Sequence, residues 1–193
     1  MVGHVKTRLI PAFGAERATR IYAQLVERTL RTVEATEATA SLWVAGDIAH
    51  HSVTDWARRH ALPVHAQCAG DLGDRMSHCI ATLAKKHERV LLIGTDCPAL
   101  ETHDLHAAAA ALTESCHWVF TPAEDGGYVL VGSNMPSAAP FKNIAWSTHE
   151  VMQQTRNALQ NQAGTWAETT TLWDVDEATD VHRAQRLALI DGR

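Results

Sequence analysis

The sequence has little of what marks several large protein classes. Its 193 residues include only four cysteines, which stand far apart without a CxxC pair, so neither a disulfide framework nor a cysteine-rich zinc site is predicted. No apolar run approaches the length of a membrane-spanning helix. Because no secretory leader is recognisable either, we expect a cytoplasmic protein with reduced thiols.

Long runs of one charge are also missing. The 17 basic and 22 acidic residues give a net charge of −5 and are spread along the chain, so neither nucleic acid nor a membrane is an expected partner. The 12 histidines are scattered without an HExxH pattern, and exposed helix or loop positions account for them better than metal ligation. Small molecules are therefore the expected partners, and homodimer formation stays open.

The chain does contain a regular alternation of helical and strand-like periodicity. Helices are predicted over 15–33, 53–59, 71–83, from 102, from 147 and over 179–190, and strands over 40–45, 64–67, 89–94, 117–121, 128–132 and 172–175. This order is typical of an α/β fold with a mostly parallel, mixed sheet, to which the two strands around Asp125 add an antiparallel excursion. No repeat or linker interrupts the pattern, so residues 1–193 are expected to form one domain.

Two of the predicted strands end at a carboxylate. The apolar run 90–93 stops at Asp96, and a second strand is followed by Asp125 in an Asp-Gly-Gly turn. Ligands of open α/β sheets bind at the carboxyl ends of strands, so both carboxylates are candidate ligands for Mg²⁺ or Mn²⁺, and Asp125 is also a candidate to orient a hydroxyl group. Asp96 alone is explained as well by a turn or cap, and Asp125 alone is explained better by a plain hairpin turn, but together they favour a site. We therefore expect the strand that ends at Gly94 to lie centrally, with Asp96 and Asp125 facing one cleft.

The chain opens with a loop-like stretch rather than a strand. Doubly wound domains usually begin with a strand that leads into a phosphate loop, and no such strand precedes this stretch. Lys6 and Arg8 stand two residues apart and would project to the same side of an extended loop, which suits a phosphate group. A solvated basic tail is the alternative for these two residues.

Six motifs in a fixed order resemble one bacterial family. They are Gly3-x-Val5-Lys6-Thr7-Arg8-Leu9, Gly70-Asp71-Leu72-Gly73-Asp74-Arg75-Met76, Gly94-Thr95-Asp96-Cys97-Pro98, Asp125-Gly126-Gly127-Tyr128, Ile144-x-Trp146-Ser147-Thr148 and Asp174-Val175-Asp176. On these motifs the chain resembles the bacterial "glycosyltransferase A" proteins, a domain-of-unknown-function family of nucleotide-diphospho-sugar transferase-like proteins. It is distantly similar to the molybdenum cofactor and 2-phospho-lactate nucleotidyltransferases. The resemblance implies a three-layer, Rossmann-like GT-A fold, here without its usual first strand.

The resemblance also implies a nucleotide over the carboxyl edge of the sheet, with Mg²⁺ or Mn²⁺ held by aspartate. It places the helix start at Asp71 and Arg75 toward the nucleotide or acceptor, where ion pairing at the helix end is the alternative. Gly126 and Gly127 would let the backbone approach a ligand, and Trp146 would stack on a base or sugar unless it is a core residue. The expected activity is that of a metal-dependent glycosyltransferase with a nucleotide-diphospho-sugar donor and a small-molecule acceptor.

Two other functions stay open. A nucleotidyltransferase would use a nucleoside triphosphate, act on a phosphorylated small molecule and release diphosphate. A non-catalytic nucleotide-binding module is the alternative that the missing strand suggests. Among the remaining polar residues, Ser147 is predicted to cap a helix, and Asp174 and Asp176 are predicted to end a strand and cap the last helix in preference to binding metal. Cys97 is predicted to be a packed residue rather than a nucleophile.

Overall fold

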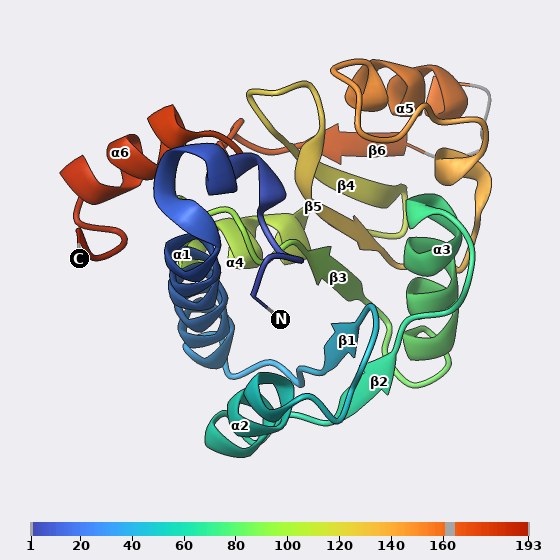
Figure 1. The fold of residues 1–193 in the computed structure, drawn as a ribbon. Helices are drawn as coiled ribbons and strands as arrows, with labels where there is room; N and C mark the ends of the chain where they lie inside the picture. Colours follow the sequence, from blue (N-terminus) through green and yellow to red (C-terminus); the bar gives the residue numbers. More distant parts are fainter. Residues whose placement is uncertain (1, 161–164, 193) are drawn as a thin grey trace.

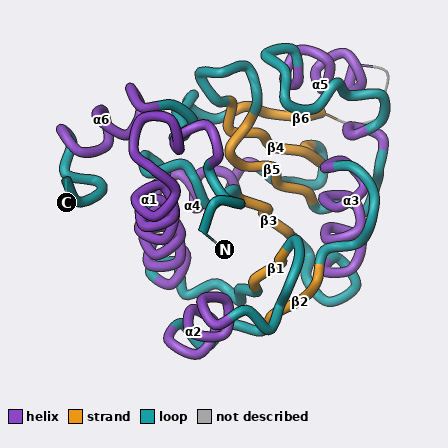
Figure 2. Tube along the Cα trace, viewed as in Figure 1, coloured by secondary structure: helices purple, strands orange, loops and turns teal. Residues whose placement is uncertain are grey.

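The computed structural model describes residues 2–160 and 165–192 and has a mixed α/β fold (Figures 1 and 2). Its elements follow in the order η1 (Thr7–Leu9), α1 (Ile10–Glu34), β1 (Leu42–Val44), α2 (His51–Arg59), β2 (Val64–Ala66), α3 (Leu72–Leu83), β3 (Val90–Ile93), α4 (Thr102–Ala111), β4 (Cys116–Pro122), β5 (Tyr128–Ser133), η2 (Ala139–Phe141), α5 (Val151–Gln160), β6 (Thr165–Glu168) and α6 (Ala178–Arg186). Most of the predicted helices and strands are confirmed. None of the helices in the described ranges combines the length and apolar character that crossing a membrane requires.

The six described strands form two sheets. β3, β5, β4 and β6 lie side by side in that order; β5 runs antiparallel to β3 and β4, whereas β4 and β6 are parallel. β1 and β2 form a separate parallel pair. The mostly parallel, mixed sheet is therefore confirmed. The antiparallel excursion is β5, which runs against the other three strands of its sheet.

The position of β3 corrects the prediction that this strand lies centrally. Within the described residues β3 is an edge of the four-stranded sheet and pairs with β5 alone, from Val90 opposite Ser133 to Ile93 opposite Leu130. The β1–β2 pair lies on the β3 side of the sheet (Figure 1) but belongs to a different sheet. The apolar character of β3 reflects packing on its two faces, not two hydrogen-bonded neighbours.

Helices cover both faces of the four-stranded sheet. Alternate side chains of a strand point to opposite faces, so each strand packs against helices on both sides. On one face, side chains of β3 and β4 pack with α4 in a core cluster that includes Leu91, Val119, Leu105 and Ala108. On the other face, the intervening side chains pack with α3 and α5 in a cluster that includes Leu92, Phe120, Ile80 and Leu159. The result is the helix–sheet–helix layering that the family resemblance implies.

The start of α5 corrects a second prediction. Ser147 lies in the left-handed region with a φ of 65° and the helix begins at Val151, so Ser147 does not stand at its N-cap. The Thr148 hydroxyl instead accepts a hydrogen bond from the Glu150 N–H at 3.3 Å. The Ser-x-x-Glu pattern fits a capping box, but the backbone turns at Ser147 before the helix starts.

Candidate functional site

The segment 172–175 brings a distant part of the chain to the end of β3. The strand predicted there is wrong: the strand of this region is β6, and Leu172 forms an isolated bridge with Ala123. Further along, the Val175 N–H donates to the carbonyl oxygen of Asp96 at 2.9 Å. Because the segment bonds first to the end of β4 and then to the loop after β3, it forms no continuous ladder. These bonds place the aspartates on either side of Val175 beside Asp96.

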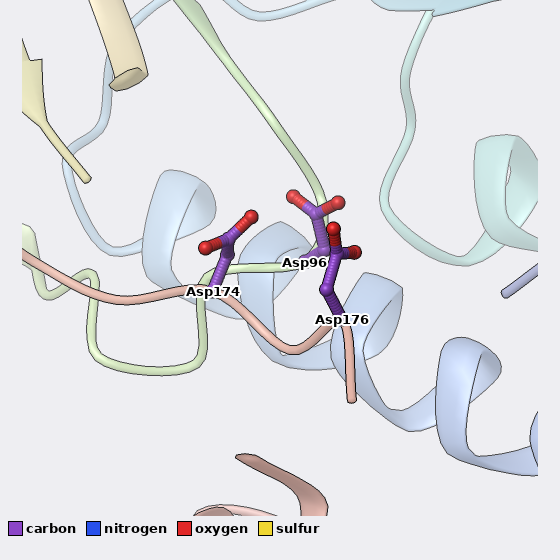
Figure 3. A group of neighbouring side chains, drawn as sticks. All are labelled: Asp96, Asp174 and Asp176. Atoms are coloured by element: carbon purple, nitrogen blue, oxygen red, sulfur yellow. The ribbon is translucent and has the colours of Figure 1, made fainter. Parts of the chain in front are cut away.

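Three carboxylates meet at this place (Figure 3). Asp96, Asp174 and Asp176 are all half-buried, and each offers an oxygen that lies within 4.8 Å of the others. Asp125, the predicted second metal ligand, is outside this group. The structure thus joins one predicted residue to two aspartates for which strand-end and capping roles were favoured.

Lys6 and Arg8 lie at the same carboxylates. The Lys6 ammonium donates to Asp96 Oδ2 at 3.0 Å and to Asp176 Oδ1 at 2.8 Å, and its side chain is only 10% exposed. The Arg8 guanidinium donates to Asp176 Oδ2 at 2.8 Å from a largely exposed position. The two basic residues therefore project toward one site, as expected from their spacing. Their partners in this structure are carboxylates, and phosphate contact stays a prediction.

Burial and neighbouring charges set the ionisation of this group. Burial raises the pKa of Asp174 to about 6, and the negative charges of Asp125, Asp96 and Asp176 act in the same direction. Burial also disfavours ionisation of Asp176, but its hydrogen bond and attraction to Lys6 lower the pKa of that carboxyl. For Lys6 burial opposes the positive charge, yet Asp96 and Asp176 raise its pKa. Ionisation is therefore disfavoured at Asp174 and favoured at Asp176, and the negative charge of Asp125 acts on Asp174 as well.

The Asp125 turn is organised by its own backbone. Asp125 is exposed, and its Oδ1 accepts a hydrogen bond from the Gly127 N–H at 2.8 Å. Gly126 has a φ of 92°, and a Cβ added there would lie 2.1 Å from the carbonyl oxygen of His149. The glycine is therefore required by close packing of two loops, whereas ligand approach at Gly126 and Gly127 stays a prediction.

The remaining predicted site residues gather at the start of α3. Asp71 caps this helix through a reciprocal pair of hydrogen bonds with Asp74, and the Arg75 guanidinium donates to the Gly70 carbonyl oxygen at 3.2 Å. Trp146 is half-buried, and a Cβ added at Gly73 would lie 2.8 Å from its ring. Within the described residues, no hydrogen bond or ion pair joins Asp71, Arg75 or Trp146 to the three carboxylates. Their nucleotide-binding roles stay predictions.

Cys97 adjoins Asp96 but is not an activated thiol. It is 3% exposed, and burial raises its pKa to about 12. Nucleophilic cysteines have a lowered pKa and an accessible sulfur. The prediction of a packed residue is confirmed.

The fold defines the class of protein to which this chain is similar. A solved structure from Desulfovibrio desulfuricans G20, provisionally assigned as a nucleotide-diphospho-sugar transferase, is 26% identical and has a TM-score of 0.84 over 100% of this chain and 84% of its own. The chain itself belongs to the DUF2064 family, described as an uncharacterized protein conserved in bacteria, whose model matches residues 29–148. This membership confirms the family resemblance, and four of the six motifs lie within the matched residues.

Two further solved structures share the fold at low identity. A CMP:2-keto-3-deoxy-manno-octonic acid synthetase complexed with CTP is 10% identical, covers 85% of this chain and 87% of its own, and has a TM-score of 0.59. A cytidylyltransferase from Leptospira borgpetersenii serovar Hardjo-bovis (strain JB197) is 10% identical, covers 90% and 86%, and has a TM-score of 0.55. At this identity the likeness concerns the fold alone. A comparison with curated proteins gives no match.

Proposed function

We propose that this protein is a metal-dependent glycosyltransferase that uses a nucleotide-diphospho-sugar donor. The observation that carries the proposal is the meeting of Asp96, Asp174 and Asp176 with Lys6 and Arg8 beside the end of β3. Carboxylates for a hard cation and basic groups for phosphate are the two components that a bound nucleoside diphosphate needs. The similarity to the Desulfovibrio structure supports the same class of donor.

The three carboxylates fit Mg²⁺ or Mn²⁺. An octahedral cation with oxygen ligands at about 2.1 Å requires oxygens that lie roughly 3 to 4 Å apart. The oxygens of Asp96, Asp174 and Asp176 already lie within 4.8 Å of one another, so small side-chain rotations suffice. The position also accepts a cation in this structure, because the Lys6 ammonium is held there by two of the three carboxylates.

The chain's own residues would have separate roles in this transfer. Asp96, Asp174 and Asp176 would hold the cation, which supplies positive charge to the leaving diphosphate. Lys6 and Arg8 would bind the same diphosphate as the bond from the sugar carbon to its oxygen breaks. The exposed Asp125 would accept a hydrogen bond from the acceptor hydroxyl and orient it. The acceptor oxygen would then form the new bond to the sugar carbon, and its proton would pass to the Asp125 carboxylate.

Nucleotide binding with and without Mn²⁺ tests the cation site. We expect nucleotide sugars to raise the melting temperature in the presence of Mn²⁺, because a ligand of the folded state stabilises it. Asp96→Asn should lower the Mn²⁺-dependent affinity by about tenfold or more, measured by calorimetry, since a neutral amide binds a hard cation poorly. Asp191→Asn removes an exposed carboxylate near the end of the chain and is the matched control. Equal binding by Asp96→Asn at an equal melting temperature would exclude a metal role for Asp96.

The reaction products test the type of transfer. Glycosyl transfer releases a nucleoside diphosphate, whereas nucleotidyl transfer from a nucleoside triphosphate releases inorganic diphosphate. We expect release of the nucleoside diphosphate, dependent on Asp125. Release of inorganic diphosphate would replace the proposal with nucleotidyl transfer. Binding without turnover for any donor and acceptor pair would favour the non-catalytic module.

A further inference from the structure

The Lys6 ammonium lies at the place proposed for the divalent cation. It donates to Asp96 at 3.0 Å and to Asp176 at 2.8 Å, which are two of the three carboxylates of the group. Nine-tenths of its side chain is buried, whereas the side chains of Asp96 and Asp176 are 34% and 36% exposed. The carboxylates are therefore already neutralised in part by a charge that the chain itself supplies.

The backbone around Lys6 is held at two points. Lys6 adopts a left-handed conformation with φ 45° and ψ 49°, which is uncommon for a residue with a side chain. Its carbonyl oxygen accepts from the Leu9 N–H at 2.9 Å, and Leu9 is fully buried in the core. Leu9 thus anchors the segment on one side of Lys6. The ion pairs of Lys6 and Arg8 hold the residues that precede Leu9.

We propose that Lys6 acts as an internal counter-cation, which occupies the carboxylates in the ligand-free protein and leaves them when a divalent cation binds. This inference rests on the proposed function, in which the released ammonium then pairs with the donor diphosphate. Lys6 thereby couples the two ligands: the cation alone must displace it without compensation, whereas the cation together with a diphosphate gives it a new partner. The protein should bind the cation weakly alone and tightly with nucleotide, and by reciprocity the cation should tighten nucleotide binding.

The competition follows from the shared oxygens. A divalent ion would take its ligands from Asp96 and Asp176, the same side chains that accept the Lys6 hydrogen bonds. Two positive charges held at neighbouring positions repel each other. Arg8 contacts Asp176 from an exposed position, so it competes less.

Mn²⁺ titration without nucleotide tests the competition. We expect Lys6→Met, which keeps the stem and removes the charge, to bind Mn²⁺ about 10- to 100-fold more tightly than the wild type, the effect of the charged hydrogen bonds that the ion no longer breaks. Lys85→Met removes an exposed lysine that follows α3 and should leave Mn²⁺ affinity unchanged. Equal or weaker binding by Lys6→Met, or an equal gain in Lys85→Met, would overturn the inference, as would absence of Mn²⁺ binding in all three proteins.

Amide hydrogen exchange of the wild type gives a second test that needs no variant to fold. Deuterium uptake over residues 2–9 should rise when Mg²⁺ is added and fall again when UDP is added with it. Unchanged uptake under Mg²⁺ concentrations that saturate calorimetric binding would overturn displacement of Lys6. The metal-only steps do not depend on the donor, so a failure of the glycosyltransferase proposal to find a nucleotide sugar is distinguishable from a failure of this inference.

Discussion

Replacement of Gly126 by alanine tests how the Asp125 turn is held in place. Gly126 has a φ of 92°, and the added Cβ would lie 2.1 Å from the carbonyl oxygen and 2.7 Å from the carbonyl carbon of His149. Because both are backbone atoms, a side-chain rotation cannot relieve the contact. Gly126 also accepts a hydrogen bond from the Met152 N–H at 2.8 Å, which ties the first turn of α5 to this loop.

The expected loss of unfolding free energy has two parts. A left-handed conformation costs a residue with a Cβ about 1–2 kcal/mol. The movement of the His149 loop away from the new methyl group would also break the Met152 hydrogen bond, worth about 0.5–1.5 kcal/mol. We therefore expect Gly126→Ala to destabilise the protein by about 2–3 kcal/mol in urea unfolding followed by circular dichroism.

Gly46 provides a matched control for the cost of placing a residue with a Cβ in the left-handed conformation. Its φ is 103°, and nothing lies within 4 Å of an added Cβ. Gly46→Ala should therefore cost only the conformational penalty of about 1–2 kcal/mol. If the two variants lose the same free energy, the close approach of the His149 backbone is not what requires glycine at position 126.

Three further predictions concern burial and charge. In the presence of a chelator, Asp174→Asn should stabilise the protein by about 1–2 kcal/mol near pH 8 and much less near pH 4, judged by urea midpoints. Burial raises the pKa of Asp174 in the folded protein to about 6, so the stability of the wild type falls as pH rises through that value. Equal gains at both pH values would refute this. Cys97 is 3% exposed and should react with a thiol reagent only upon unfolding, whereas the half-buried Cys68 should react in the native state. Rapid labelling of Cys97 in the native protein, identified by mass spectrometry, would contradict its burial. Leu130→Ala should lower the free energy of unfolding in urea by about 2–5 kcal/mol, because Leu130 is 1% exposed. Leu187→Ala, at a 56% exposed position, should change it by no more than about 0.5 kcal/mol. A small loss at Leu130 would refute its place in the core.

The order of helices and strands could be predicted because periodicity is a local property. The apolar spacing that predicted α4, for example, places Leu105, Ala108 and Leu112 in the core. The place of β3 in its sheet could not be predicted, since it depends on which segments meet after folding. The segment 172–175 shows the same limit: its buried residues resemble a strand, but its hydrogen bonds go first to the end of β4 and then to the loop after β3.

Only part of the candidate site could be predicted from the sequence. Asp96 stood out because it ends an apolar strand, whereas Asp174 and Asp176 are far from it in sequence. The bond between the Val175 N–H and the Asp96 carbonyl oxygen brings them together. The sequence signal that could have indicated Asp174 and Asp176 as site residues was their Asp-x-Asp spacing directly after apolar residues. For Lys6 the chemistry of the side chain indicated an anionic partner without deciding between phosphate and carboxylate.

The separation of the two sheets has a consequence for association. In the described part of the chain, β1 pairs only with β2 and β3 only with β5, so each leaves one backbone edge without a strand partner. Such edges accept any extended chain that reaches them, including an unfolded copy of the same protein. Both are short, three residues in β1 and four in β3, which limits the number of hydrogen bonds that an added strand could form. The extent of self-association should therefore depend on protein concentration more strongly during refolding than in the folded state.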